Sequence, residues 1–368
     1  MRVALLGTRG IPASYGGFET FAEELSTRLA ARGHQVAVYT RTRHESPYRG
    51  VELRWLPTVR HKYLDTLAHT ALATVHLLLR GADAALYCNG ANAIFTWAPR
   101  LAGIPVALNV DGLERKRKKW NRLARGWYRL SEWLATFCPS EIITDAASIR
   151  DYYARTYGKQ STFIPYGAEV GRVAEDDVIR QLGLRRGEYF LYVSRLEPEN
   201  NALLVREAFE RVAGERQLAL IGDAPYAQAY IRQVRATRDP RIVMPGAIYG
   251  RGYAQLGSHC FAYIHATEVG GTHPALIEAM GRGALVLYLD TEENREVAGG
   301  VGLPFANSVE SLAGAMKRAI EMDAAERERL GRSAQERVRA RYSWDAVTDA
   351  YELLLRRLTG VAADGPAS

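Results

Sequence analysis

The sequence predicts an α/β protein made of two Rossmann-like, doubly wound domains. Short apolar runs that suit buried strands alternate with amphipathic helical stretches, and this alternation occurs twice along the 368 residues. That length allows two domains that each bury a core of their own. Hydrophobic residues make up 47% of the chain and charged residues 24%, which is typical of an ordinary globular protein.

The expected strands form two sets separated by a polar crossing segment over residues 168–187. They lie at Val3–Leu6, Gln35–Tyr39, Ala84–Tyr87, Pro105–Asn109, Glu141–Thr144 and Thr162–Ile164, and then at Tyr189–Val193, Gln217–Ile221, Ile242–Met244, Cys260–Ile264 and Leu285–Tyr288. We expect domains over 1–168 and 169–342. A last helix over 343–360 begins near Ser343, a good N-cap, and a small polar tail over 361–368 should be disordered.

Cysteine spacing and hydropathy indicate the cellular compartment in which the protein works. Cys88, Cys138 and Cys260 lack the spacing of metal ligands, so we expect free thiols, a reducing environment and no metal site. The opening MRVALLG does not resemble a signal peptide, and the longest apolar run, 67–79, is too short to span a bilayer. These features predict a cytoplasmic protein.

Positive charge is concentrated in the first half. Residues 1–168 contain 23 Lys/Arg and 13 Asp/Glu, a net charge of +10. Residues 169–368 contain 25 Lys/Arg and 28 Asp/Glu, a net charge of −3, which gives the total of +7. An anionic partner should therefore meet the first domain.

The stretch EVGGTHPALIEAM predicts an anion site at the start of a helix. Its proline suits the first helical position, and Thr272 or His273 can cap the helix. Unpaired backbone N–H groups and the helix dipole favour a phosphate at Gly270, Gly271 and Thr272. Glu278 would then face a group that bears hydroxyls. The alternative is a tight loop without a ligand.

A second glycine-rich loop, GTRGIPASYGGFE, follows the first expected strand. Its spacing differs from the G-x-G-x-x-G fingerprint, which disfavours an NAD-dependent enzyme. Gly16 and Gly17 lead into a helix and allow close approach of a ligand. Arg9 and Tyr15 are candidate ligand contacts, although a solvated turn explains Arg9 equally well.

A strongly basic stretch begins near residue 115. Eight cations without an acidic residue between them follow one another at Arg115, Lys116, Arg117, Lys118, Lys119, Arg122, Arg125 and Arg129. On a helical wheel the apolar side carries Trp120, Leu123, Trp127, Leu130 and Leu134. This pattern is typical of a helix at an anionic membrane surface. The alternative is that the apolar side packs on the domain's own sheet; nucleic acid is disfavoured because no known motif is present.

In the second half, YVSRLEPENN places Arg195 just past a strand. Such a position faces the ligand crevice of an open α/β sheet, and a guanidinium suits a diphosphate. The alternative is an ion pair with Glu197 or Glu199. A later strand-then-glycine loop offers Tyr249 as a contact for a nucleobase.

With these segments in order, the chain resembles glycosyltransferase family 4 of the GT-B type. The resemblance to a bacterial rhamnosyltransferase-like branch rests on GTRGIPASYGGFETFAEEL, DGLERKRKKW, FIPYGAE, VSRLEPENN, VGGTHPALIEAM and NREVAGGVGLPF. It implies two Rossmann-like domains facing a cleft, with the last helix returning to the first domain. It also implies a retaining hexosyltransferase that needs no metal or other cofactor.

The resemblance assigns roles to individual positions. Glu278 matches the glutamate that binds the donor ribose, Arg195 the arginine on the diphosphate, and Gly271 and Thr272 its backbone contacts. Gly16 and Gly17 match glycines that approach the donor phosphate from the other domain.

Two positions depart from the family pattern. Gly270 stands where a second glutamate is common, with Glu268 nearby but out of register, and Asn200 stands where a lysine is common. We expect backbone amides to compensate, and replacement of Glu268 to be less damaging than replacement of Glu278. Asp111, after an expected strand, is the candidate that orients or deprotonates the acceptor hydroxyl; the alternative is a helix N-cap.

These observations together predict transfer of a sugar, L-rhamnose from dTDP-L-rhamnose, to a polyprenyl-diphosphate-linked acceptor at the inner face of the cell membrane. Arg9, Tyr15 and Asp111 are the expected acceptor contacts. The alternatives are a UDP- or GDP-sugar donor with a soluble acceptor, and a non-catalytic protein that binds nucleotide sugars or membranes. The oligomeric state does not follow from the sequence.

Overall fold

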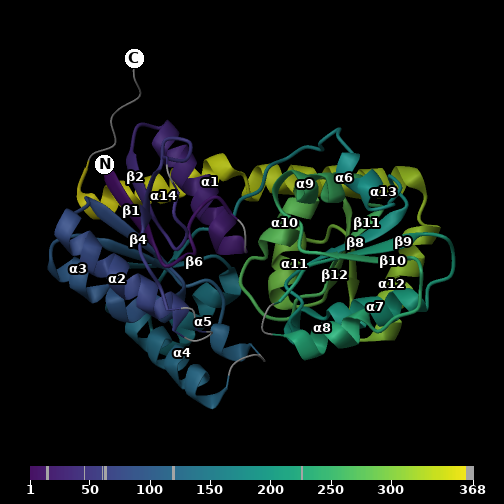
Figure 1. Cartoon of the computed structure of the whole chain (residues 1–368), viewed down its shortest axis with the longest axis horizontal. Coiled ribbons are helices and arrows are strands. Elements are labelled where there is room, and N and C mark those ends of the chain that lie inside the picture. Colours follow the sequence, from purple (N-terminus) through teal and green to yellow (C-terminus); the bar gives the residue numbers. More distant parts are fainter. Residues whose placement is uncertain are drawn as a thin grey trace. The chain divides into compact units, whose positions relative to one another are not determined.

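The computed structural model describes residues 1–13, 16–44, 46–59, 61, 64–117, 121–224 and 227–361. The chain divides into two compact units (Figure 1). The first comprises Met1–Lys116, Trp120–Tyr166 and Trp344–Ser368, and the second comprises Arg117–Lys119 and Gly167–Ser343. Each unit is built around one parallel sheet.

The first unit has a seven-stranded sheet in the order β3-β2-β1-β4-β5-β6-β7, with every pairing parallel. Its strands are β1 (Arg2–Leu6), β2 (Gln35–Thr40), β3 (Glu52–Trp55), β4 (Ala84–Cys88), β5 (Val106–Asn109), β6 (Glu141–Thr144) and β7 (Thr162–Phe163). Its helices are α1 (Gly17–Ala31), α2 (Asp65–Arg80), η1 (Gly90–Phe95), α3 (Trp97–Leu101), η2 (Glu114–Lys116), α4 (Arg122–Ala135), α5 (Ala147–Tyr157) and α14 (Trp344–Thr359).

The second unit has a six-stranded parallel sheet in the order β10-β9-β8-β11-β12-β13. Its strands are β8 (Tyr189–Val193), β9 (Gln217–Ile221), β10 (Ile242–Gly246), β11 (Ala262–His265), β12 (Leu285–Leu289) and β13 (Leu303–Phe305). Its helices are α6 (Asp177–Gln181), η3 (Pro198–Asn200), α7 (Ala202–Glu210), α8 (Gln228–Arg235), α9 (Gly250–His259), α10 (Pro274–Gly281), α11 (Glu292–Ala298), α12 (Val309–Glu321) and α13 (Ala324–Arg341).

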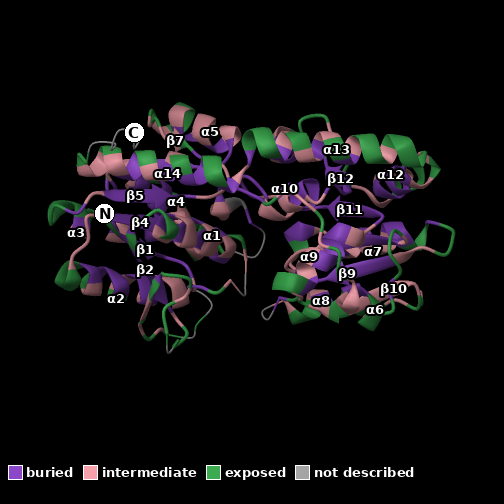
Figure 2. Cartoon of the chain, turned by 90° about the horizontal axis from the view of Figure 1, so that it is seen from above, coloured by how far each residue is buried: buried purple, intermediate pink, exposed green. Residues whose placement is uncertain are grey.

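The central strands are buried on both faces because helices cover each side of each sheet (Figure 2). All five residues of β4 and all five of β12 are buried. Continuous apolar runs of this kind are typical of parallel strands inside α/β domains. The alternation of such runs with amphipathic helices therefore predicted the fold class correctly.

The last helix, α14, packs in the first unit rather than in the second. The ring centroids of Phe21 on α1 and Tyr351 on α14 lie 5.1 Å apart, and Asn109 Nδ2 donates a hydrogen bond of 2.8 Å to the Tyr351 hydroxyl. The helix begins directly after Ser343 and buries Trp344, Val347, Tyr351 and Leu354. The contact with Asn109 ties the helix to the end of β5.

Every expected strand is present within two residues of its predicted ends. Two strands, β3 and β13, were not predicted; both are short edge strands with one neighbour each. The predicted tail over 361–368 lies, after residue 361, outside the described residues.

Candidate functional site

The strand order of the second sheet reverses between β8 and β11, which pair directly. In an open parallel sheet a reversal of this kind leaves a crevice beyond the carboxyl ends of the two strands, where ligands bind. The loop after β8 carries Arg195, and the loop after β11 carries Gly270, Gly271 and Thr272. Two of the segments predicted for the donor, Arg195 and the glycine loop before α10, therefore lie at one edge of one sheet.

Hydrogen bonds join these two loops. Asn201 Nδ2 donates to the Ala266 carbonyl at 2.9 Å and to Glu268 Oε1 at 3.0 Å, while the backbone N–H of Glu268 donates to the Glu199 carbonyl at 3.0 Å. Glu268 Oε1 also accepts from Asn307 Nδ2 at 2.8 Å. Glu268 therefore connects the loops after β8, β11 and β13.

Arg195 is half-buried, and its guanidinium has no hydrogen-bond or ion-pair partner among the described residues. The alternative of an ion pair with Glu197 or Glu199 is not realised there. Asn200, which is buried, donates from Nδ2 to the Arg195 carbonyl at 2.7 Å, and the Tyr192 hydroxyl donates to the Asn200 carbonyl at 2.7 Å. Asn200 thus holds the backbone of Arg195, a role its sequence position did not reveal.

Helix α10 begins at Pro274, as predicted, and His273 occupies its N-cap position. The His273 side chain makes no capping hydrogen bond, so the prediction is wrong for His273. The His273 ring turns away instead: Nδ1 lies 2.8 Å from Asn294 Oδ1 and 2.8 Å from His265 Nε2. At the start of the helix Pro274 has no N–H, and the Leu276 N–H donates to the His273 carbonyl at 3.0 Å. Of the first three helical positions, Ala275 therefore supplies the N–H that can meet a ligand.

The proton on this imidazole pair can be assigned from Asn294. The Asn294 amide nitrogen donates to the carbonyls of Thr267 and Leu289, at 3.2 and 2.9 Å, so its oxygen must accept from His273 Nδ1. Burial lowers the pKa of His273 to about 4 and the pKa of His265 further below its usual range. Both rings are therefore neutral at pH 7.

Gly270 faces the ring of His273, and a Cβ at this position would overlap Nε2 and Cδ2 of that ring. This contact gives a physical reason for the departure from the family pattern. A glutamate at position 270 has no room while His273 holds its buried place.

Glu278 accepts a hydrogen bond of 2.6 Å from the Tyr253 hydroxyl of α9. Burial raises the pKa of Glu278, opposed by the Tyr253 hydrogen bond and by the charge of Arg282. Glu278 is nevertheless half-buried rather than fully buried, so a ligand can reach its carboxylate. Tyr249 is the N-cap residue of α9 and is exposed. The sequence analysis did not identify Tyr253 as the partner.

In the first unit, the glycine-rich loop after β1 is held by two acids of α1. Glu19 Oε1 accepts from the backbone N–H of Arg9 at 2.9 Å, and Glu23 Oε2 accepts from that of Ala13 at 2.6 Å. Gly16 is the N-cap residue of α1, and Gly17 is its first residue. These acids were not singled out from the sequence, although they fall at helical spacing just after the glycines. Tyr15 lies outside the described residues.

Asp111 follows β5 in the left-handed backbone region, with φ of 55°. Its N–H donates to Asn109 Oδ1 at 3.0 Å. Burial is the main cause that raises the pKa of Tyr166, and the negative charge of Asp111 raises it further. The N-cap of α4 is Asn121, whose Oδ1 accepts from Ala124 N–H at 2.9 Å, so Asp111 does not cap that helix. Asp145, at the end of β6, is fully buried and also acts on Tyr166.

The basic stretch contains a counter-charge that the sequence analysis did not anticipate. Arg115 Nε lies 3.0 Å from both carboxylate oxygens of Glu132, which is buried. Arg117 is 7% exposed. Lys118, Lys119 and Trp120 lie outside the described residues, as does the side chain of Lys116.

The predicted apolar side of α4 is divided between core and surface: Leu134 packs against the core of the first unit and Trp127 is half-buried. Leu123 is 85% exposed, and Leu130, Trp133 and Phe137 are also exposed, whereas Ser131, Glu132 and Ala135 form the buried side. Arg122, Arg125 and Arg129 are exposed as well. The exposed side of α4 therefore combines apolar and cationic residues.

Among the described residues, no group of three or more His, Cys, Asp or Glu side chains could hold a metal ion. Within the same residues, no helix has the length and apolar character needed to cross a membrane.

Two family models match the sequence. Residues 15–172 match the model described as Glycosyltransferase Family 4, and residues 187–322 match the one described as Glycosyl transferases group 1. No curated protein matches the sequence.

Solved structures with the same fold cover nearly the whole chain. Sucrose-phosphate synthase from Thermosynechococcus elongatus is 20% identical, with a TM-score of 0.78 over 98% of this chain and 100% of that one. Anabaena HepE in complex with UDP-glucose is 17% identical, with a TM-score of 0.79 over 96% and 99%. WaaG, a glycosyltransferase involved in lipopolysaccharide biosynthesis, is 16% identical, with a TM-score of 0.73 over 98% and 100%. The chain has the GT-B fold of these glycosyltransferases, and each of its halves matches a glycosyltransferase family model.

Proposed function

We propose that the second unit binds a nucleoside-diphosphate sugar at the reversal between β8 and β11. The observation that carries this proposal is the half-buried Arg195 guanidinium, which has no partner among the described residues and stands at the same sheet edge as the glycine loop that leads into α10. A guanidinium and the positive end of a helix dipole are complementary to a diphosphate. The similar fold of Anabaena HepE, solved in complex with UDP-glucose, supports this class of donor.

In the proposed reaction, the bond between the sugar C1 and the diphosphate oxygen breaks as the acceptor oxygen bonds to C1. Charge accumulates on the leaving diphosphate, where Arg195 and the α10 backbone stabilise it before and during bond cleavage. The acceptor proton passes to the leaving phosphate or to Asp111. Retention of the anomeric configuration is what the family resemblance implies.

The sugar and the acceptor are narrower proposals. The rhamnosyltransferase-like segments favour L-rhamnose from dTDP-L-rhamnose and a polyprenyl-diphosphate-linked acceptor. The similar structures, by contrast, include complexes with UDP and with UDP-glucose, and synthases of sucrose phosphate and trehalose phosphate. A UDP-sugar with a soluble acceptor is therefore the second candidate.

Thermal shift with a ligand panel separates these candidates. We expect dTDP and dTDP-rhamnose to raise Tm more than UDP, UDP-glucose or GDP, and Arg195→Gln to remove most of the effect. A larger increase in Tm with the UDP compounds would show that the donor is a UDP-sugar instead. Absence of a response to every nucleotide would overturn donor binding itself. Transfer measured with the best donor then distinguishes an enzyme from a non-catalytic nucleotide-sugar binder.

We also propose that α4 rests on the anionic inner face of the cell membrane. Its exposed side carries Leu123, Leu130 and Trp133 next to Arg122 and Arg125. Apolar side chains that enter the interface, with arginines that meet anionic headgroups, form a surface for reversible attachment. A membrane-bound acceptor would then be within reach of the first unit.

A further inference from the structure

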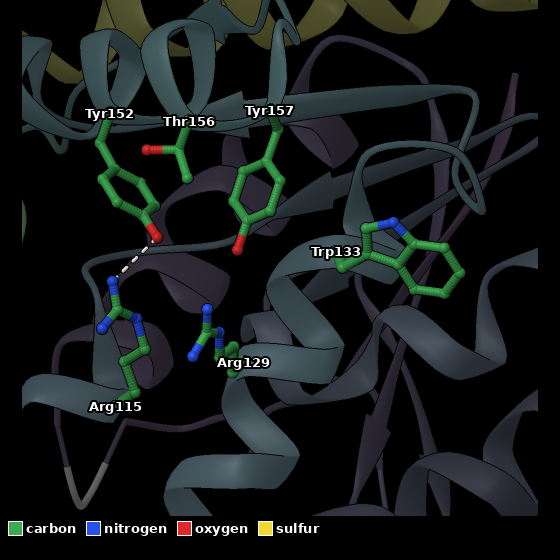
Figure 3. A pocket seen from close by; sticks show the side chains of 6 residues that line it. All are labelled: Arg115, Arg129, Trp133, Tyr152, Thr156 and Tyr157. Carbon is green, nitrogen blue, oxygen red and sulfur yellow. Dashed lines mark hydrogen bonds between the residues drawn. The ribbon is translucent and has the colours of Figure 1, made fainter.

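A cavity of about 540 Å³ lies in the first unit between α4, α5 and the loop after β5 (Figure 3). Tyr152, Thr156 and Tyr157 line it from α5, Arg129 and Trp133 from α4, and Arg115 from the loop. Its volume falls within the range of small-molecule sites. None of these residues belongs to the candidate donor site of the second unit.

Three of the lining residues, Arg115, Tyr152 and Tyr157, bind one buried carboxylate, that of Glu132. Glu132 accepts from Arg115 Nε at 3.0 Å, from the Tyr152 hydroxyl at 2.9 Å and from the Tyr157 hydroxyl at 3.2 Å. Arg115 Nη2 also donates to the Tyr152 hydroxyl at 2.9 Å. One cation and one anion therefore cancel in this network.

Arg129 adds a second guanidinium whose charge nothing in the network cancels. It is exposed, and it has no hydrogen-bond or ion-pair partner among the described residues. Arg115 and Arg129 both point into the cavity from the same side, below the α5 side chains (Figure 3). With Glu132 neutralised by Arg115, the cavity has a net charge of +1 and presents guanidinium N–H groups as donors.

An aromatic wall adjoins these donors. Trp133 lines the cavity and is 52% exposed, and its ring lies edge-on to that of Phe137 with centroids 4.7 Å apart. Leu130, also exposed, precedes Trp133 by one turn of the same helix. A ligand in this cavity would have an anionic group at the arginines and an organic part against the indole.

From these contacts we infer that the cavity is a binding site for a phosphate group attached to an organic moiety. Two guanidinium groups from different segments can donate to different oxygens of one tetrahedral phosphate, which a planar carboxylate matches less well. The phosphate comes either from a lipid headgroup, since α4 is the helix proposed to rest on the membrane, or from a soluble phosphate ester. The site does not depend on the donor or on the transfer reaction proposed above.

Calorimetric titration with inorganic pyrophosphate tests the site in Arg195→Gln protein, because that background separates the cavity from the candidate donor site. We compare Arg129→Gln with Arg125→Gln, a matched loss of one exposed arginine on α4 that does not line the cavity. Loss of charge-assisted hydrogen bonds predicts roughly tenfold or more weaker binding for Arg129→Gln, with little change for Arg125→Gln. Arg115 is left intact because its removal would strand the buried Glu132.

Vesicles identify the source of the phosphate. Wild-type protein that prefers phosphatidylcholine vesicles doped with phosphatidic acid over those doped with phosphatidylglycerol indicates a lipid headgroup, if Arg129→Gln abolishes the preference. Arg125→Gln, which removes a cation from the proposed membrane face, should weaken binding to both vesicles alike and keep the preference. Equal binding to the two vesicles, with pyrophosphate binding still dependent on Arg129, indicates a soluble phosphate ester. Equal weakening of pyrophosphate binding by both substitutions, or no pyrophosphate binding by the Arg195→Gln protein, overturns the site.

Discussion

The ring of His273 lies against the backbone of Gly270 so closely that no side chain fits between them. Buried contacts with His265 and Asn294 hold this ring in place, so it cannot move aside at low cost. Gly270→Ala should therefore shift the glycine loop and destabilise the second unit by about 1–3 kcal/mol, the usual cost of overpacking. Urea unfolding and the nucleotide dissociation constant measure the two effects.

A double-mutant cycle provides the control. His273→Ala removes the ring that a Cβ at position 270 would meet, so adding Gly270→Ala to it should cost much less than adding Gly270→Ala to the wild-type chain. Independent, additive effects of the two substitutions would contradict the packing explanation.

The sequence predicted the layers and most strands because buried parallel strands carry their own signal. β8 and β12 are apolar over nearly their whole length, and their helices repeat with helical period. β3 gave no such signal because it alternates charged and apolar residues (ELRW), and β13 because it is three residues long and contains a proline (LPF). Their existence depends on pairing partners far away in the sequence.

Residues of the site that directly follow a strand could be predicted from the sequence, but the hydrogen-bond partners of their side chains could not. Arg195 and the start of α10 follow from local pattern and strand order. The hydrogen bond between Tyr253 and Glu278 and the ion pair between Arg115 and Glu132 join residues 25 and 17 positions apart. Such pairs are set by how helices pack, which local periodicity does not encode.

Glu278→Gln should weaken binding of the nucleoside diphosphate while leaving binding of inorganic pyrophosphate unchanged. We propose that the carboxylate accepts hydrogen bonds from ribose hydroxyls, and pyrophosphate has none. Loss of an interaction with a charged acceptor predicts about 1.5–3 kcal/mol, roughly a tenfold or larger rise in Kd. Titration of both ligands against both proteins measures the difference.

Glu268→Gln is the matched comparison. Glu268 accepts from Asn201 and Asn307 amides, so its replacement should lower the stability of the loops more than it lowers nucleotide affinity. A larger loss of affinity in Glu268→Gln than in Glu278→Gln would reverse the assignment of the ribose contact.

The stability of the second unit should fall as pH decreases from about 6.5 toward about 4. His273 stays neutral in the folded state because burial lowers its pKa to about 4, whereas the unfolded chain takes up a proton near its usual value of 6.5. Below 6.5 the unfolded state binds more protons, so stability is lost across this window, by about 3 kcal/mol from His273 at about 1.4 kcal/mol per pH unit. Urea unfolding at several pH values gives the slope.

His273→Asn should flatten that slope in the transition of the second unit while keeping a residue suited to an N-cap. Burial also lowers the pKa of His69 in the first unit to about 4, so the first unit keeps its own pH dependence in this variant. An unchanged slope for the second unit in His273→Asn would show that other groups control it.

Asp111→Asn should reduce transfer by about 10²–10⁴-fold if the carboxylate takes or orients the acceptor proton. Asn tolerates the left-handed backbone of this position, where φ is 55°, so folding and donor binding should stay intact. Transfer is measured with the donor that gives the largest thermal shift, and the nucleotide Kd is measured in parallel. Full transfer by a correctly folded Asp111→Asn protein would remove the carboxylate from the reaction.

Leu123→Asn should weaken binding to anionic vesicles because Leu123 is 85% exposed on α4, beside Arg122 and near Arg125. Withdrawing one leucine from the interface and replacing it with an amide costs about 2 kcal/mol or more, a loss of well over tenfold in partitioning. Flotation with vesicles that contain anionic lipid measures it, with Leu353→Asn as the control. Leu353 is 66% exposed on α14, outside the basic stretch, so the same substitution there should leave flotation unchanged. Equal flotation of both variants and the wild type would mean that α4 does not enter the membrane interface.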